Sequence, residues 1–293
     1  MLSFVGLVII VSLVSLIMAS FFDLKTGEIP EKVNYGYVFL VLAFSAFDSI
    51  SSGDASLFLS TLIPGAAFFI VGYALFYFGQ WGGGDVKLMA GIGCSLGYLA
   101  YAGSLPAVFL FPYYVTYFVN MGFVAFPYVV IYGLILGIGN KKTGKEFLGY
   151  FGDMKTRLFL IFSLMPSVVA VSLDLFYIAV LYLMIPPMLV AALYLKAVEK
   201  TALQEDVLVS RLREGDVPAE DLFVGGEKIA SKRDIEGFGK EDIEGIRNLA
   251  REGKIPESIT IKKGIKFAPV LFLTYITVIY AGNFMEIAFR ALA

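Results

Sequence analysis

Long stretches without any charged residue alternate along the chain with short charged segments. Seven such stretches lie at 1–22, 33–47, 55–84, 88–140, 158–173, 175–195 and 267–285. A helix needs about 20 apolar residues to cross the hydrocarbon core of a bilayer, so the longest stretch can hold two crossings. The pattern predicts an all-α polytopic membrane protein with about eight transmembrane helices (six to eight), of which 33–47 and 158–173 are the least certain.

The overall composition agrees with a protein that resides in a lipid bilayer. Of the 293 residues, 58% are hydrophobic, and the mean hydropathy is +0.78. The first stretch lacks the basic start of a secretory signal and is long enough to span. We therefore expect a retained first helix, and a cleaved signal peptide is the alternative.

The basic residues are concentrated in one set of loops. If eight helices alternate from an outside N-terminus, the inner segments are 23–32, 79–87, 141–157 and 196–266. These segments hold 22 of the 23 Lys and Arg residues, and basic loops stay in the cytoplasm. We expect a multi-pass protein of the cell membrane in this orientation. The net charge of −2 suggests no nucleic-acid partner.

The segment 197–264 differs sharply from the rest, with 27 charged residues among 68. "DLFVGGEKIA" at 221–230 predicts two short strands around a Gly-Gly turn. "GKEDIEGIRNLAREGK" at 239–254 has apolar residues at helical spacing. We expect three parts: a membrane domain (1–196), a small α+β cytoplasmic domain (197–264) and a final transmembrane helix (265–293). A solvated loop with partial helix is the alternative for the middle part.

The absence of histidine restricts the possible chemistry. The chain has no His and a single Cys, Cys94. This excludes Ser-His and Cys-His nucleophile pairs, HExxH zinc sites and disulfide frameworks. We expect no metal and no cofactor, so any catalysis falls to carboxylates, lysine or hydroxyls.

Two aspartates stand out because both close apolar stretches on the predicted cytoplasmic face. Asp23 ends the first helix, and Asp85 begins the fourth within "QWGGGDVKLMAG". Two carboxylates within hydrogen-bond reach tend to share one proton, which suits hydrolysis of a peptide bond. Gly82, Gly83 and Gly84 would let a substrate backbone approach Asp85 closely and permit positive φ.

Each of these features also has a simpler structural interpretation. Asp85 could N-cap the helix that follows it, and Asp23 could be an interfacial charge paired with Lys25. The remaining membrane or outer carboxylates belong to the opposite face and cannot join the pair: Asp48, Asp54, Asp174 and Glu286.

The motifs resemble those of a known family. "GGGDVKLMAGIG" is similar to the G-x-G-D-x-K-L signature of the type IV prepilin and preflagellin peptidases, which are membrane aspartyl proteases. "DLKTGEIPEKVN" is similar to their other signature, and "GIKFAPVLFLTYI" at 264–276 resembles the final-helix motif of archaeal members. The three matches span the chain in the family's order.

The resemblance implies that Asp23 and Asp85 are the catalytic pair. It also implies pilin-like precursor substrates, with a basic leader, a cleavage site usually after glycine, and an apolar helix, cut at the cytoplasmic membrane face. Bacterial members carry a cysteine-rich insertion and an N-methyltransferase activity. This chain lacks both the cysteines and the insertion, so we expect peptidase activity only. The charged domain and two extra crossings depart from a minimal six-helix member.

Three supporting residues are candidates with two interpretations each. Lys87 could stabilise the ionised aspartate or lie as a basic helix flank. Pro30 is expected at the start of the second helix. Asn34 could cap that helix or form a hydrogen bond across the bundle.

Two other functions remain open from the residues alone. A presenilin or signal-peptide-peptidase type of intramembrane protease shares GxGD but places its other aspartate deep within a helix. An ion- or proton-coupled transporter could use membrane carboxylates. A Ser-Lys hydrolase using Lys87 and Ser20 is a weaker possibility.

Overall fold

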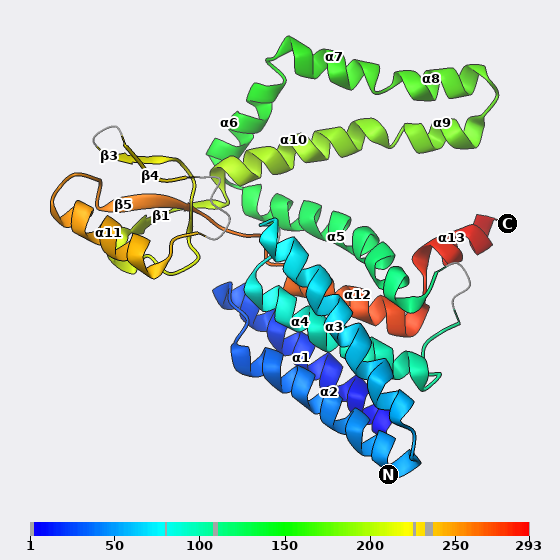
Figure 1. Ribbon diagram of the computed structural model, residues 1–293. Helices are drawn as coiled ribbons and strands as arrows, with labels where there is room; N and C mark the ends of the chain where they lie inside the picture. The colour runs from blue at the N-terminus through cyan, green and yellow to red at the C-terminus, as the bar shows by residue number, and fades with distance from the viewer. Residues whose placement is uncertain (1–2, 80, 108–110, 225–226, 232–236, 293) are drawn as a thin grey trace. The chain divides into compact units, whose positions relative to one another are not determined.

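The computed structural model describes residues 3–79, 81–107, 111–224, 227–231 and 237–292 (Figure 1). The chain divides into two compact units. Unit 1 comprises Met1–Tyr128 with Gly264–Ala293, and unit 2 comprises Val129–Lys263. Each unit is described separately below.

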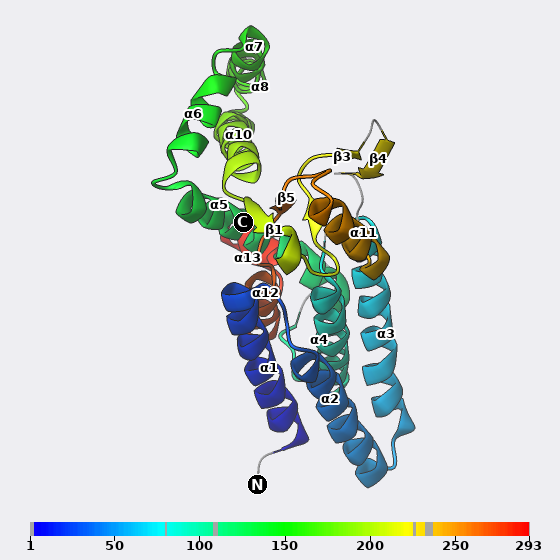
Figure 2. The ribbon, with the colours of Figure 1, turned by 90° about the vertical axis from the view of Figure 1, so that its left-hand side faces the viewer.

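Unit 1 is a helical bundle in which the last helices of the chain pack among the first. Its elements are α1 (Phe4–Thr26), α2 (Glu31–Ser52), α3 (Ala55–Tyr77), α4 (Gly83–Tyr101), the first part of α5 (Tyr113–Gly137), α12 (Ala268–Ala281) and α13 (Phe284–Leu292). Helices α1 to α4 run side by side (Figure 2), and α12 packs against α1. The bundle is therefore complete only when α12, from the end of the chain, packs against α1 at its beginning.

Six helical segments of the described residues are long and apolar enough to cross a membrane. They are Phe4–Thr26, Glu31–Ser52, Ala55–Tyr77, Tyr113–Gly137, Met154–Ser172 and Ile178–Thr201. The other two predicted crossings correspond to α4 and to α12, which has only 14 residues and measures about 21 Å at 1.5 Å per residue. The predicted all-α polytopic fold is confirmed.

The first helix shows how the bundle faces its surroundings. Along α1, buried positions include Val8, Ser12 and Leu16, whereas Val14 and Ile17 are about half exposed, at 50% and 53%. The inner face thus includes the small polar Ser12 beside apolar residues, whereas the outer face is apolar, which is typical of helices that pack in lipid.

Helices α3 and α4 pack against each other through glycines of α4. A Cβ on Gly93 would lie 2.5 Å from the Pro64 carbonyl oxygen, and a Cβ on Gly97 would collide with the Ser60 carbonyl oxygen. Small residues permit this close backbone approach in membrane helices. Cys94 is buried and faces Gly65, so it acts as a small packing residue.

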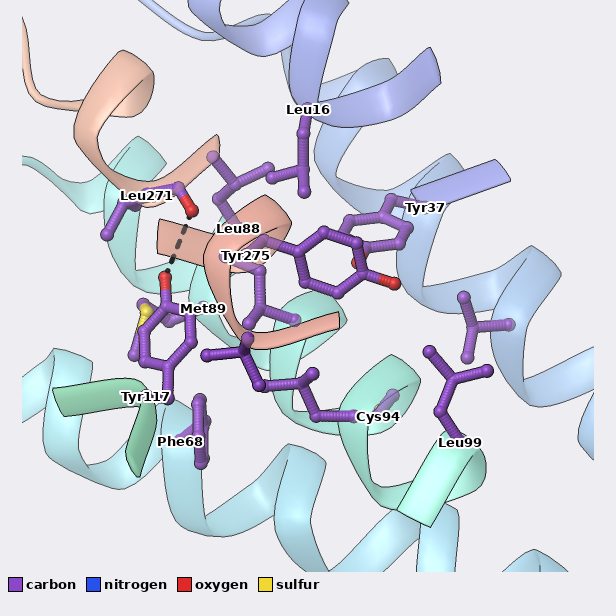
Figure 3. Close-up of a cluster of buried hydrophobic side chains, with 14 of the residues drawn as sticks. Leu16, Tyr37, Phe68, Leu88, Met89, Cys94, Leu99, Tyr117, Leu271 and Tyr275 are labelled. Carbon is purple, nitrogen blue, oxygen red and sulfur yellow. Dashed lines mark hydrogen bonds between the residues drawn. The ribbon is translucent and has the colours of Figure 1, made fainter. Parts of the chain in front are cut away.

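The core of unit 1 collects side chains from six helices (Figure 3). Tyr117 of α5 donates a hydrogen bond to the Leu271 carbonyl of α12 at 3.3 Å. Ser12, Ser95 and Tyr275 form a buried chain of hydroxyl groups at 2.8 and 2.7 Å. Because these bonds join α1, α4 and α12, they hold α12 within the bundle.

The predicted final helix, 265–293, is divided in the structure by a break at Gly282. Asn120 of α5 donates to the Gly282 carbonyl at 2.6 Å and accepts from the Phe284 N–H at 3.1 Å. The amide side chain thereby satisfies backbone groups that the break leaves unpaired.

The first part of unit 2 is helical. It contains α6 (Lys141–Tyr150), α7 (Met154–Phe162), α8 (Met165–Ser172), α9 (Phe176–Tyr182) and α10 (Ile185–Thr201). Asp174, in the left-handed conformation at φ +58°, lies in the turn between α8 and α9. This turn falls where the charge pattern placed a loop between two crossings.

The charged segment that follows forms a small α+β fold. Strands β1 (Gln204–Leu208), β5 (Ser258–Lys262) and β2 (Val217–Pro218) pair antiparallel in the order β1-β5-β2, after which β3 (Leu222–Val224) pairs with β4 (Glu227–Ala230). Helix α11 (Lys240–Arg251) buries Ile243 and Ile246 in a shared core with β5. The α+β prediction is correct, and the alternative of a solvated loop is wrong. The predicted Gly-Gly turn at 225–226 lies outside the described residues.

Candidate active site

Asp23 lies in the last turn of α1, where its side chain is only 7% exposed. The helix ends at Gly27, whose φ of +78° favours glycine and whose N–H donates to the Asp23 carbonyl at 2.9 Å. The carboxylate oxygen Oδ2 accepts from the N–H of Ala268, the first residue of α12, at 2.9 Å. The Asp23 carboxylate is therefore hydrogen-bonded to the start of α12.

The simpler interpretation of Asp23, a pair with Lys25, does not hold. The Lys25 ammonium instead lies over the Phe21 ring, 5.7 Å from its centroid.

Asp85 is the third residue of α4, which begins at Gly83. Its Oδ2 accepts from the Gly82 N–H at 3.2 Å. Gly82, not Asp85, occupies the N-cap position, so the N-cap interpretation of Asp85 is wrong in detail. The other oxygen, Oδ1, is buried and has no hydrogen-bond partner among the described residues.

The structure brings these two carboxyl groups together. Asp23 is close enough to act electrostatically on Asp85, although 62 positions separate them in the sequence. On the same helix as Asp85, Tyr98 donates to Asp48 at 2.6 Å. Asp48 therefore lies about 20 Å from Asp85 along α4 and cannot join the pair, as the sequence predicted.

The two sequence motifs that carry the aspartates are in direct contact. The Asn34 side-chain amide donates to the Gly84 carbonyl at 3.2 Å. The Ile29 side chain fills the space beside Gly84, where a Cβ would lie 3.2 Å away. Asn34 therefore forms a hydrogen bond across the bundle and does not cap its own helix.

Lys87 forms an ion pair that neither of its two predicted interpretations named. Its ammonium binds Glu31 at 2.7 Å and lies 5.1 Å from the centroid of the Tyr35 ring. These contacts direct it away from the aspartates. Pro30 precedes the second helix as its N-cap residue, one position earlier than expected, and α2 begins at Glu31.

The three glycines differ in what surrounds them. None has a positive φ, which in this loop occurs at Gly79 instead. A Cβ on Gly83 would meet no other atom within 4 Å, whereas Gly84 abuts Ile29. The open side of the loop is therefore at Gly83, next to Asp85, and the expected use of positive φ in Gly82–Gly84 is wrong.

Sequence reasoning missed the contribution of the segment before α12. Trp81 of the glycine loop packs against Phe267, with ring centroids 5.5 Å apart. Lys266 acts electrostatically on Asp23. The signal was the stretch "GIKFAP", which resembled a family motif but had no assigned role. Among the described residues, no group of three Cys, Asp or Glu side chains could hold a metal.

Comparison with known proteins supports the family resemblance. The model of the type IV leader peptidase family matches residues 10–139, a region that includes both aspartates. This match confirms the resemblance to the family that the sequence motifs indicated. None of the comparisons supports the intramembrane-protease or transporter alternatives.

Curated members of the type IV leader peptidase family are similar to the chain over different lengths. Prepilin peptidase EppA of Methanothermobacter thermautotrophicus is 23% identical and covers 96% of both chains. A preflagellin peptidase of Methanococcus maripaludis is 34% identical over 49% of this chain and 66% of its own. A preflagellin peptidase of Methanocaldococcus jannaschii is 33% identical over 29% of this chain and 36% of its own. No solved structure matches the chain.

Proposed function

We propose that the chain is an aspartic-type endopeptidase that removes leader peptides from pilin-like or flagellin-like precursors, with Asp23 and Asp85 as its catalytic pair. The main observation is the meeting of the two aspartate motifs at one end of unit 1, where one carboxylate oxygen of Asp85 is buried and unpartnered. The names of the prepilin and preflagellin peptidase relatives support the substrate class.

The pair suits hydrolysis of a peptide bond without a metal. One carboxylate takes a proton from water while the water oxygen bonds to the carbonyl carbon, and the other carboxyl group gives its proton to the carbonyl oxygen. In the resulting diol, the first group returns its proton to the leaving nitrogen as the C–N bond breaks, and the second regains its proton from a hydroxyl. Both carboxyl groups end as they began.

The position of the pair favours cleavage near the membrane surface over cleavage deep in the bilayer. Asp23 lies in the last turn of α1 and Asp85 in the first turn of α4. Both aspartates therefore lie at helix ends, whereas the presenilin type requires one deep within a helix. The charge pattern of the loops supports the cytoplasmic face as the site of cleavage.

The substrate expected here has a basic leader followed by an apolar helix that remains in the bilayer. The exposed apolar side chains of α1 to α3 support a lipid environment on the enzyme's side. We also expect no N-methyltransferase activity, so the new amino terminus should remain unmethylated in the presence of a methyl donor.

Cleavage of such a precursor in liposomes tests the proposal. We would compare the wild-type enzyme with Asp23→Asn and Asp85→Asn and identify the product's new amino terminus by mass spectrometry. Asparagine keeps the size of the side chain but cannot exchange the proton, so both variants should be inactive while folded. A wild-type enzyme that fails to cut, or a variant that cuts normally, would contradict the proposal.

A further inference from the structure

The start of α12 donates a hydrogen bond to Asp23, and among the described residues it donates none to Asp85. The first N–H groups of a helix lack partners within it and carry partial positive charge. In α12, the N–H of Ala268 donates to Asp23 Oδ2 at 2.9 Å, and both residues are buried. Helix α12 therefore supplies a hydrogen-bond donor suited to a carboxylate at this position.

Lys266 adds a full positive charge to the same side of Asp23. Its ammonium occupies the space into which a side chain at Gly27 would project. It is thus held at the end of α1, where a cation is favoured, and it attracts the Asp23 carboxylate electrostatically. Tyr128 donates to the Lys266 carbonyl at 2.7 Å, which anchors this segment.

Asp85 has a different environment. One of its oxygens accepts from the Gly82 N–H, and the other is buried without a hydrogen-bond partner in the described part of the chain. The lysine on its own helix, Lys87, is bound to Glu31. A buried oxygen without a donor is a poor place for negative charge and a suitable place for a proton.

We propose that the start of α12 and Lys266 hold Asp23 as the carboxylate that takes the proton from water, so that Asp85 carries the shared proton and gives it to the substrate carbonyl. Lys266 is a positioning residue, because it acts through Asp23. This inference rests on the proposed function and assigns different roles to the two aspartates.

Other charged and titratable groups around the pair have separate partners or positions. Lys25, on the same helix as Asp23, lies over the Phe21 ring. On α2, Glu31 is bound by Lys87 of α4. From α5, the Tyr117 hydroxyl group feels the charge of Asp85 and donates to the Leu271 carbonyl. Of the described residues, Lys266 is the cation that acts on Asp23.

The test is the dependence of precursor cleavage on pH in Lys266→Met and Lys266→Arg. Without the cation, Asp23 ionises less readily, so the acid limb of the activity profile should move to higher pH by about one pH unit in Lys266→Met. Activity on the acid side should fall about tenfold. Lys266→Arg keeps the charge and should restore the wild-type limb. Lys25→Met is the matched control, because Lys25 has the same charge and lies two residues from Asp23 but points elsewhere.

The outcomes separate this inference from the proposed function. A shifted limb in Lys266→Met, restored by Arg and absent in Lys25→Met, supports the role of Lys266. Loss of activity at all pH values without a shift, or an equal shift in Lys25→Met, overturns it while cleavage by the wild type still supports the peptidase. If Lys266→Met does not fold, Lys266→Gln keeps a polar side chain and should show the same shift. Failure of the wild type to cleave would instead reject the peptidase itself.

Discussion

The two ends of unit 1 each carry two aspartates, but their surroundings differ. At the Asp48 end, Tyr98 donates to Asp48 and Tyr101 donates to Asp54, both at 2.6 Å. At the Asp23 end, Asp23 is buried against a backbone N–H, and Asp85 has a buried oxygen without a partner. The carboxylates at the Asp48 end thus have hydrogen-bond donors within the protein. At the Asp23 end, Asp85 keeps an acceptor position for a donor from outside the described chain.

The difference between the two ends supports the catalytic role proposed for Asp23 and Asp85. Polar groups buried in a protein are normally hydrogen-bonded, and an exception calls for an explanation. The exception in Asp85 coincides with a second carboxyl group nearby and with an open glycine loop. We therefore propose different roles for aspartate at the two ends, because its partners differ.

The largest expected effect comes from replacing aspartate by asparagine at each end. Asp23→Asn and Asp85→Asn should each reduce kcat by about 10³-fold or more, because proton transfer is lost. Asp48→Asn should leave kcat within about twofold of the wild type, because it removes only the charge of a structural acceptor. Steady-state cleavage of a precursor by the purified variants measures this. A comparable loss at both ends would remove the distinction between them.

A smaller effect is expected from filling the open side of the glycine loop. A Cβ at Gly83 would meet no neighbouring atom within 4 Å, so for Gly83→Leu we expect unchanged thermal stability and about tenfold lower kcat/KM, which corresponds to about 1.4 kcal/mol. A Cβ at Gly122 in α5 would also meet no atom within 4 Å, so Gly122→Leu is the matched control without an effect on cleavage. Unchanged kcat/KM in Gly83→Leu would show that the substrate does not approach Asp85 from this side.

The hydrogen bond between the two aspartate motifs should make a modest contribution to the stability of the protein. Asn34→Ala removes the donor to the Gly84 carbonyl and should lower stability by about 0.6 to 1.7 kcal/mol, the range for hydrogen bonds in membrane proteins. Cleavage should weaken with it because the loop loses an anchor. Thermal unfolding in detergent measures the first effect. Lys87→Met, which breaks a partly exposed ion pair, should cost at most about 1 kcal/mol; a greater loss than in Asn34→Ala would reverse this ranking.

The smallest effect is expected at the Asp48 end. Tyr98→Phe removes one hydrogen bond to Asp48 and should lower the free energy of unfolding by about 0.6 kcal/mol, with cleavage unchanged. Denaturation and cleavage measured on the same preparation test this. If cleavage falls by more than the loss of stability explains, the two ends are coupled through α4.

The sequence by itself determined the membrane architecture and the common end of the two aspartates. The lengths of the uncharged stretches predict the transmembrane helices. Because successive helices cross in opposite directions, Asp23 and Asp85 are expected at the same end of the bundle. It also predicted the α+β fold of the charged segment, since Ile243 and Ile246 recur at helical spacing and are buried together. These features depend on periodicity and length, which a single sequence carries.

Only the tertiary structure decided which partners the site residues have. The Ala268 N–H that binds Asp23 lies 245 positions away. Lys87 turns to Glu31, and Asn120 holds the break at Gly282. Every residue except proline has a backbone N–H, so a bond to one leaves no mark in the residue types. Such partners follow only from the packing that brings distant helix ends together.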